Sequence, residues 1–342
     1  MSLLRYAILR LISGALLIVA SATAIFLLMR LLGNPIAIAL AGRVSEEEIA
    51  LRTEAAGLNR PLQVQFFEYI GKLLGGSLGQ TTLSSQDVEL LLWEALPASL
   101  EFGFLVLLFA AVISTPIGFY AAHNAGRLRS ESLRVSAIVL YATPIFLFAV
   151  LLKIVFTVWI PLFPVAGRLS VNSQIALQTQ SPNTGFIFFD ALASGNWLAV
   201  ADYLIHMALP VVAVGLVLSA SLIRAVRVTV LEQLTSDWYL ETRNKFGDNR
   251  QTATTHLFRP ALATIITSFG TQAIVVLTGM VFAEKVFEIR GLGYLLTEAV
   301  LSRDYNLVQG IVVAIALIVI AINLVTDLIA AAIDPRFRKL VR

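Results

Sequence analysis

Long apolar runs separated by polar segments dominate the chain. Several of these runs exceed the roughly 18 residues that a helix needs to cross the bilayer hydrocarbon. With 58% hydrophobic and 14% charged residues, the 342-residue chain is too apolar for a soluble globular domain. We therefore predict an all-α integral membrane protein with six transmembrane helices, the fourth of which is the shortest and could begin a few residues earlier. The predicted spans are Leu11–Met29, Phe102–Ala122, Val135–Ile160, Met207–Ile223, Ala261–Ala283 and Leu307–Ile333.

Charge is divided unequally between the two sides of this arrangement. An even number of spans puts both termini on one side, together with residues 124–134 and 224–259. That side carries 15 Lys+Arg and six Asp+Glu, whereas the opposite side carries nine and 14. The positive-inside rule then places both termini and the 224–260 loop in the cytoplasm of a bacterial-type cell membrane. The basic excess therefore indicates topology and not nucleic-acid binding.

The polar segment after the first span is predicted to fold into short helices. Glu46-Glu47-Glu48 opens a helical pattern that ends at Gly57, a second helix ends near Gly75, and a third covers Asp87–Ala95. Its aliphatic and aromatic content is higher than that of a disordered linker. The first span itself continues beyond a cleavage-like Ala-Ser-Ala, so we expect it to be uncleaved. We divide the chain into 1–30 (tail and first span), 31–97 (extracytoplasmic helical segment), 98–334 (transmembrane core) and 335–342 (cytoplasmic tail).

The segment Arg224–Pro260 is a long hydrophilic loop between two clean apolar runs. Apolar residues at near-helical spacing predict a short helix over about Val228–Phe246. Gly247 suits the left-handed conformation that ends a helix, and Asp248 can begin a second one. Pro260 stands at the start of the next span, where its missing N–H costs little. A bent helical loop of this kind suits docking of another protein.

The same loop resembles a known motif. Tyr239 to Gly247, nine further residues, and Leu257-Phe258-Arg259-Pro260 are similar to the Glu-Ala-Ala loop of binding-protein-dependent ABC importer permeases. Glu241, Gly247 and Pro260 match in register, while Thr242 and Arg243 replace the two alanines. The resemblance implies that this loop docks on the ATPase subunit. The residues it assigns to ATPase coupling are Tyr239, Glu241, Thr242, Arg243, Gly247 and Pro260.

Short sequence motifs along nearly the whole chain, called phrases below, resemble the dipeptide/oligopeptide/nickel branch of these permeases. In two of these motifs the family usually has a proline where this chain has Arg290 or Asn306. The phrases are Leu58–Gly79, Leu96–Glu101, Phe163–Gly167, Phe287–Gly293, Arg303–Asn306, Gln309-Gly310, Asn323, Asp327 and Asp334-Pro335-Arg336.

This resemblance implies a type I ABC importer permease fold and a subunit that forms the membrane path for short peptides, or for nickel and related small solutes. The implied partners are a second permease subunit (a different chain or a copy), two ATP-binding subunits, an extracytoplasmic solute-binding protein and membrane lipid. ATP hydrolysis is expected on the separate subunits, so we expect no enzyme activity here.

The residues themselves offer no catalytic or metal-binding set. The chain has no cysteine, its three histidines (His123, His206 and His256) are isolated, and Gly71-Lys72 lacks the spacing of a phosphate loop. We expect no metal and no cofactor. Of the charges inside spans, Lys153 is expected to snorkel toward the interface, and Asp327 to serve a structural pairing.

One face of the fifth span is polar. Thr264, Ser268, Thr271 and Thr278 share it at helical spacing, beside Gln272. They either line the solute pathway or allow close helix packing. The alternative function, an ion-coupled secondary transporter, would need midplane ionisable residues or interrupted helices in a repeat, which are not visible. A membrane hydrolase would need a paired nucleophile and base, and none is found. Residues 168–205 support no prediction of role.

Overall fold

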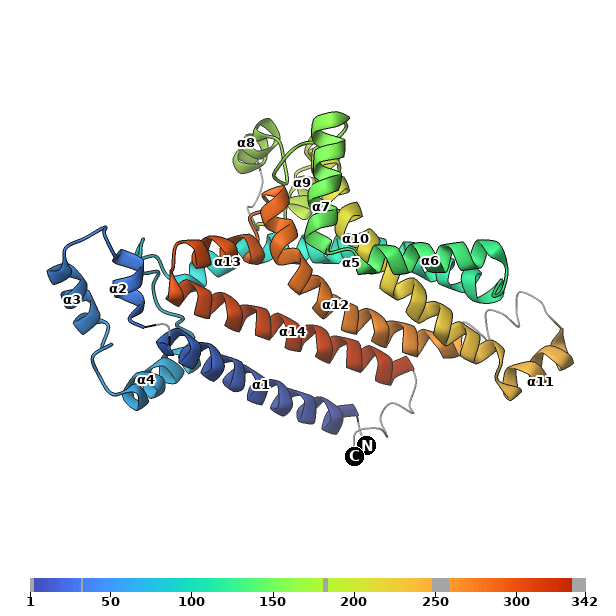
Figure 1. Cartoon of the computed structure of the whole chain (residues 1–342), viewed down its shortest axis with the longest axis horizontal. Coiled ribbons are helices and arrows are strands. Elements are labelled where there is room, and N and C mark those ends of the chain that lie inside the picture. The colour runs from blue at the N-terminus through green and yellow to red at the C-terminus, as the bar shows by residue number, and fades with distance from the viewer. Residues whose placement is uncertain (1–2, 32, 181–183, 248–258, 334–342) are drawn as a thin grey trace.

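The computed structural model describes residues 3–31, 33–180, 184–247 and 259–333, and this part of the chain is almost entirely helical (Figure 1). Its one strand-like pairing is an isolated bridge between Gln80 and Asp87. The predicted all-α fold is confirmed. The helices are α1 Leu3–Leu31, α2 Pro35–Leu40, α3 Glu46–Ala55, α4 Leu62–Leu74, α5 Val88–His123, α6 Leu128–Ala142, α7 Ile145–Lys153, the π-helix η1 Ile154–Trp159, α8 Val171–Gln180, α9 Ile187–Ala193, α10 Trp197–Leu234, α11 Asp237–Phe246, α12 Arg259–Phe287, α13 Leu292–Leu301 and α14 Tyr305–Ile333.

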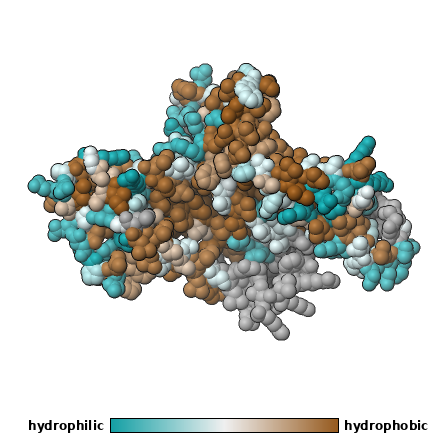
Figure 2. Space-filling view, in the orientation of Figure 1, coloured by the Kyte–Doolittle hydropathy of each residue, from teal (hydrophilic) through white to brown (hydrophobic). Residues whose placement is uncertain are grey.

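Five of the described helices, namely α1, α5, α10, α12 and α14, are long and apolar enough to cross a membrane. A sixth span is obtained if α6 and the α7–η1 helix, which are joined by a sharp bend, count as one. Hydrophobic residues cover the middle of the molecule, and hydrophilic residues gather at its two ends, over α2–α4 and over α11 (Figure 2). This distribution is the one expected of a multi-pass membrane protein.

The third span is not the continuous helix expected over residues 135–160. It breaks after Ala142, and the two parts are bent by 96°. Pro144 explains the break, because its ring keeps the preceding residue out of the helical region. Thr143 accordingly has an extended conformation with ψ 126°. The residues on both sides are apolar, so hydropathy alone did not reveal the bend.

The predicted third short helix and the second span form one helix, α5, which runs through Pro97 and Pro116. A proline removes one helical hydrogen bond and normally kinks or ends the helix. Here both sides of Pro97 are held by packing: Val88 and Leu92 lie in one buried cluster, and Ala98 and Phe102 in another. Helix α5 therefore joins the 31–97 segment to the transmembrane core.

The short helices of the 31–97 segment largely follow their sequence signals. Helix α3 begins after Ser45, whose hydroxyl accepts from the Glu48 amide, and it is followed by Gly57 at φ +69°. Helix α2 was not predicted. Asn34 caps it by accepting from the first amides, and Pro35 fills its first position.

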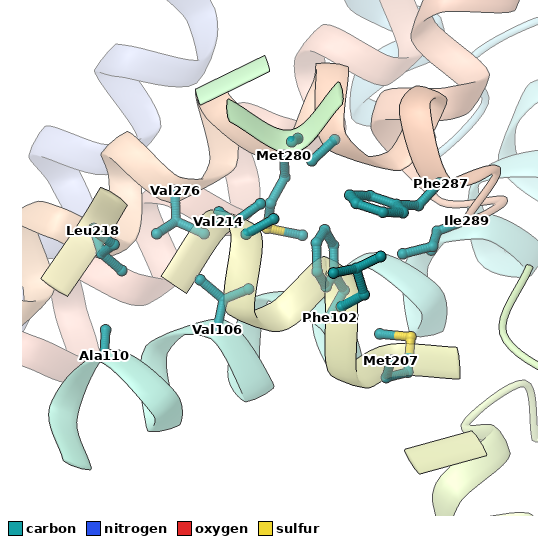
Figure 3. Close-up of a cluster of buried hydrophobic side chains, with 14 of the residues drawn as sticks. Phe102, Val106, Ala110, Met207, Val214, Leu218, Val276, Met280, Phe287 and Ile289 are labelled. Atoms are coloured by element: carbon teal, nitrogen blue, oxygen red, sulfur yellow. The ribbon is translucent and has the colours of Figure 1, made fainter. Parts of the chain in front are cut away.

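The core lies between α5, α10 and α12. Phe102, Met207, Met280, Phe287 and Ile289 are buried together there, as Figure 3 shows. Helix α10 is the central one. Of its apolar 18-residue stretch, 72% is buried, against 22–28% of the corresponding stretch in the other four long helices. It begins at Trp197, well before the predicted start of the fourth span. Helix α1 packs along α14 at the side of this core.

Candidate functional site

Helix α11 lies at the end of the molecule opposite α2–α4 (Figure 1). The predicted helix over 228–246 is in fact split, because α10 runs on to Leu234 and α11 begins only at Asp237. The backbone turns at Thr235 and Ser236, and the Ser236 carbonyl accepts the amides of Tyr239 and Leu240 at 3.1 Å. Asp237 stands in the first turn, where a negative charge favours a helix start.

A single buried ring attaches α11 to the transmembrane helices. Tyr239 is 1% exposed and belongs to one buried apolar cluster with Val226 and Val230 of α10, Ala122 of α5 and Ile265 of α12. This contact brings three transmembrane helices to one point beneath α11. A displacement of α11 would therefore act on all three.

Several other described side chains of α11 face outward. Glu241, Asn244 and Lys245 are exposed, and Trp238 and Leu240 are 40% and 42% exposed. The Thr242 hydroxyl is used within the helix, where it donates to the Trp238 carbonyl at 2.7 Å. A charged rim beside two exposed apolar side chains is a composition that fits a protein-binding surface.

Gly247 ends α11 with φ +76°, and a Cβ built on it meets no atom of the described residues within 4 Å. The predicted left-handed glycine is confirmed, and its requirement comes from backbone conformation and not from crowding. Pro260 is the second residue of α12. The predicted second helix of the loop, from Asp248, lies outside the described residues, and the side chains of Arg243 and Pro260 are not described.

The polar face predicted for the fifth span lies on α12. Thr271 and Thr278 are exposed and Ser268 is half-buried, whereas the Thr264 side chain lies outside the description. Val275 and Phe282, exposed by 46% and 57%, continue the same face. The opposite side of α12 packs closely, with Gly270 against Thr326 of α14. Thr271 and Thr278 are thus not buried against another described helix of this chain.

A buried carboxylate that the sequence did not reveal stands near the other end of α12. Glu284 is 1% exposed. It accepts from the Ser99 hydroxyl at 2.6 Å and from the amides of Gly293 and Tyr294 at 2.8 and 3.0 Å. The Leu292 amide in turn donates to the Ser99 hydroxyl at 2.8 Å. Glu284 of the preceding helix and Ser99 of the distant α5 thus satisfy the free first-turn amides of α13.

These contacts explain the Gly-Leu-Gly phrase at the start of α13. A Cβ on Gly291 would lie 2.4 Å from the Ser99 hydroxyl, and one on Gly293 would lie 2.4 Å from the Val281 Cα. The Arg-Asp-Tyr-Asn phrase has a similar capping role at the start of α14. Its buried Asp304 accepts the Leu307 amide at 3.2 Å and the Thr82 amide at 2.9 Å. Both phrases therefore cap helices at the same end of the core.

A second polar contact near this end joins α5 to the loop before α8. Arg168 donates to Glu101 at 3.0 Å, and both side chains are largely buried. Glu101 also accepts the Phe188 amide at 2.9 Å. Arg168, for which the sequence supported no role, therefore neutralises a carboxylate that directly precedes the predicted second span.

Three other polar residues singled out in the sequence also have interaction partners. Lys153 donates to the Val286 carbonyl near the end of α12, so its ammonium is bound within the protein instead of simply reaching the interface. Buried His206 lies 3.1 Å from Asp202. Asp327 has an interaction partner. No group of three or more potential metal ligands occurs among the described residues.

Comparison with known proteins identifies the family to which this chain is similar. The model of the family described as "Binding-protein-dependent transport system inner membrane component" matches residues 114–339. A di/tripeptide transport system permease protein of Pseudomonas aeruginosa is 31% identical over 315 residues, 92% of each chain. A dipeptide transport system permease protein of Escherichia coli is 31% identical over 311 residues, 90% of each chain. Another, from Alkalihalophilus pseudofirmus, is 29% identical over 338 residues, 98% of this chain and all of the relative.

Proposed function

The chain belongs to the family of inner-membrane components of binding-protein-dependent transport systems, and from this premise we propose that it is the permease subunit of an ABC importer for short peptides. The names of its relatives support peptides as the solute class. Nothing in the comparisons or the structure favours the ion-coupled alternative.

The observation that carries the coupling role is the attachment of α11. Its buried Tyr239 lies in one apolar cluster with residues of three transmembrane helices, while Glu241 and Lys245 remain exposed for a partner. We assign Tyr239, Glu241, Thr242, Arg243, Gly247 and Pro260 to coupling with a separate ATP-hydrolysing subunit. Motion of that subunit would pass through α11 to α5, α10 and α12.

Co-purification of the ATPase subunits with variants of this chain, together with peptide uptake, tests the coupling role. Gly247→Asp introduces a charged side chain at a backbone conformation that costs a non-glycine residue about 1–2 kcal/mol. We expect it to insert in the membrane but to lose uptake and ATPase co-purification. Glu241→Ala should act in the same direction more mildly, since an ion pair at an interface rim contributes little by itself.

Glu232→Ala, a loss of an exposed carboxylate outside the motif, serves as the matched control and should leave both readouts unchanged. Normal assembly and wild-type uptake by Gly247→Asp would remove the basis for assigning this loop to coupling.

The proposed assembly holds two permease subunits, two ATPase subunits and a solute-binding protein on the side of α2–α4. Both termini and α11 face the cytoplasm in this proposal. Since the chain has no cysteine, an impermeant thiol reagent should label Ser85→Cys but not Thr252→Cys in intact cells. The opposite labelling pattern would reverse the proposed orientation.

We also propose that Thr264, Ser268, Thr271 and Thr278 line the solute path. The exposure of Thr271 and Thr278 on α12 supports this use. Thr271→Cys should react with a small hydrophilic thiol reagent in the assembled transporter, and its reactivity should change when ATP is trapped. A cysteine that is inert in both states would instead indicate burial against the second permease subunit.

A further inference from the structure

Two neighbouring cavities lie at the α2–α4 end of α14. The first, of about 460 Å³, is bounded by α4, the 77–82 loop and the ends of α1 and α14. The second, of about 380 Å³, lies between α5, α13 and α14. Leu78 lines both, so its side chain separates them. Volumes of this size suit bound small molecules.

The first cavity is polar and rich in hydrogen-bond donors. Arg30 and Lys72 bring positive charge to its wall. Tyr69 and Gln309 also line it, and the Tyr69 hydroxyl and the Gln309 amide nitrogen are buried without a hydrogen-bond partner among the described residues. Gln309 is only 7% exposed. A buried donor without a partner is costly. A rotation about the last side-chain bond of Gln309 would turn its amide nitrogen toward an acceptor in the cavity, whereas at Tyr69 only the hydroxyl proton can be redirected.

The carboxylates of this cavity already have partners. Glu68 pairs with Arg60, and Asp87 accepts from the Gln80 amide at 3.1 Å. Arg30 also has a partner in the wall, since its Nε donates to the Gln65 side-chain oxygen at 2.7 Å. The groups left to recognise a ligand are Lys72, the terminal nitrogens of Arg30 and the two donors without a partner among the described residues. They suit an anionic group with several acceptor oxygens, such as a phosphate.

The second cavity is mainly apolar, although Glu89, whose carboxylate accepts the Leu78 amide at 3.3 Å, also lines it. It continues the first cavity along the membrane span. Asn306 and Gln309 of α14 line the polar cavity, whereas Val313 and Leu317 of the same helix line the apolar one. At 1.5 Å per residue, Gln309 and Leu317 lie about 12 Å apart along the helix axis. The polar cavity is thus at the end of the span, and the apolar cavity extends into it.

This order of a phosphate-binding end followed by an apolar channel matches one class of molecule at a membrane. We propose that the two cavities form a single site for a glycerophospholipid. Its phosphodiester contacts Arg30, Lys72, Tyr69 and Gln309, and an acyl chain passes Leu78 to lie between α5 and α14. A free phosphate or a peptide carboxylate would fill the polar cavity and leave the apolar one without a ligand. The bound lipid would join α4 to α1 and α14.

Native mass spectrometry of the full chain, purified in its permease assembly, tests this proposal. After delipidation, the probes are phosphatidylethanolamine, phosphatidylglycerol and inorganic phosphate, each added separately. We expect one phospholipid to be retained per chain, with no comparable retention of inorganic phosphate. Lys72→Gln and Gln309→Met should each weaken phospholipid binding about tenfold, equivalent to about 1.4 kcal/mol. Ala314→Trp should do the same by filling the apolar cavity.

Arg43→Gln, the loss of an exposed charge on the same segment but outside both cavities, is the control and should bind as the parent does. Lys72 is also exposed, so its replacement tests the site without disturbing the core. Unchanged phospholipid retention in Lys72→Gln and Ala314→Trp would show that the lipid is bound elsewhere and overturn the proposal. Equal retention of inorganic phosphate and phospholipid would also overturn it, in favour of a phosphate site. None of these readouts depends on peptide transport or ATPase coupling.

Discussion

The two ends of the transmembrane core are held together by different forces. Near α13, Glu284 and Ser99 form a buried set of four hydrogen bonds that joins α5, α12 and α13. At α11, the connection includes an apolar cluster around the Tyr239 ring, followed by Gly247, whose Cβ position meets no atom of the described residues within 4 Å. The first end is thus fixed by direction and distance, and the second mainly by burial of apolar surface.

This difference indicates which end can move as a unit. Buried hydrogen bonds lose much of their strength when their geometry changes, because each donor then lacks a partner. Apolar contacts are not directional, so α11 can tilt about Tyr239 while the cluster stays closed. An element that transmits motion from a partner should lie at such a place, whereas the α13 end can act as the rigid support.

The largest effect is expected from Glu284→Ala. It leaves three buried donors without an acceptor, each costing about 1–3 kcal/mol, so we expect a loss of roughly 5 kcal/mol in unfolding free energy. Thermal unfolding of the purified chain in detergent measures it. Lys285→Ala, a change at the next residue in an exposed ion pair with Glu298, should have little effect. Similar melting of both variants would mean that the Glu284 contacts do not stabilise this end.

The second effect is local. Tyr239→Ala removes the ring that attaches α11, and truncation of a buried aromatic side chain costs about 3–5 kcal/mol. We expect faster hydrogen exchange of the 237–246 amides, with unchanged exchange in α13. Trp238→Ala, at the neighbouring exposed ring, should leave α11 protected. Loss of protection in α13 as well would show that the two ends are not independently held.

The sequence was informative where signals are local. Hydropathy located five spans because a continuous apolar helix depends on its own residues. Gly247 and the Ser45–Gly57 helix were predictable because glycine conformations and caps are determined by neighbouring residues. The bend at Pro144 also had a local signal, which the apolar composition around it outweighed.

Features that depend on distant residues were not predictable in this way. Glu284 directly follows the apolar run that was assigned to the fifth span. Its partner Ser99 is 185 positions away, so no pattern near Glu284 indicates burial. The same reason applies to Arg168 and Glu101, which are 67 positions apart. The family motifs Phe287–Gly293 and Arg303–Asn306 were visible in the sequence. Only the fold shows that their residues take part in the caps of α13 and α14.

The smallest effects on stability are expected from glycine-to-alanine substitutions, one at the α13 end and one at the α11 end. Gly293→Ala places a Cβ 2.4 Å from the Val281 Cα, a backbone atom that cannot move aside. Overpacking of this kind costs about 1–3 kcal/mol, and we expect the midpoint of global unfolding to fall. Gly247→Ala meets no atom within 4 Å but retains φ +76°, which costs about 1 kcal/mol and affects only the end of α11.

Gly71→Ala on α4 is the control for this pair, because it has open space and no positive φ. It should be neutral or slightly stabilising, since alanine favours a helix by about 0.5–1 kcal/mol over glycine. Thermal unfolding should therefore rank Gly293→Ala lowest, while hydrogen exchange detects Gly247→Ala in the last turn of α11. If Gly247→Ala lowered the global unfolding midpoint as much as Gly293→Ala, α11 would be part of the rigid core, and the contrast between a fixed end and a movable end would be wrong.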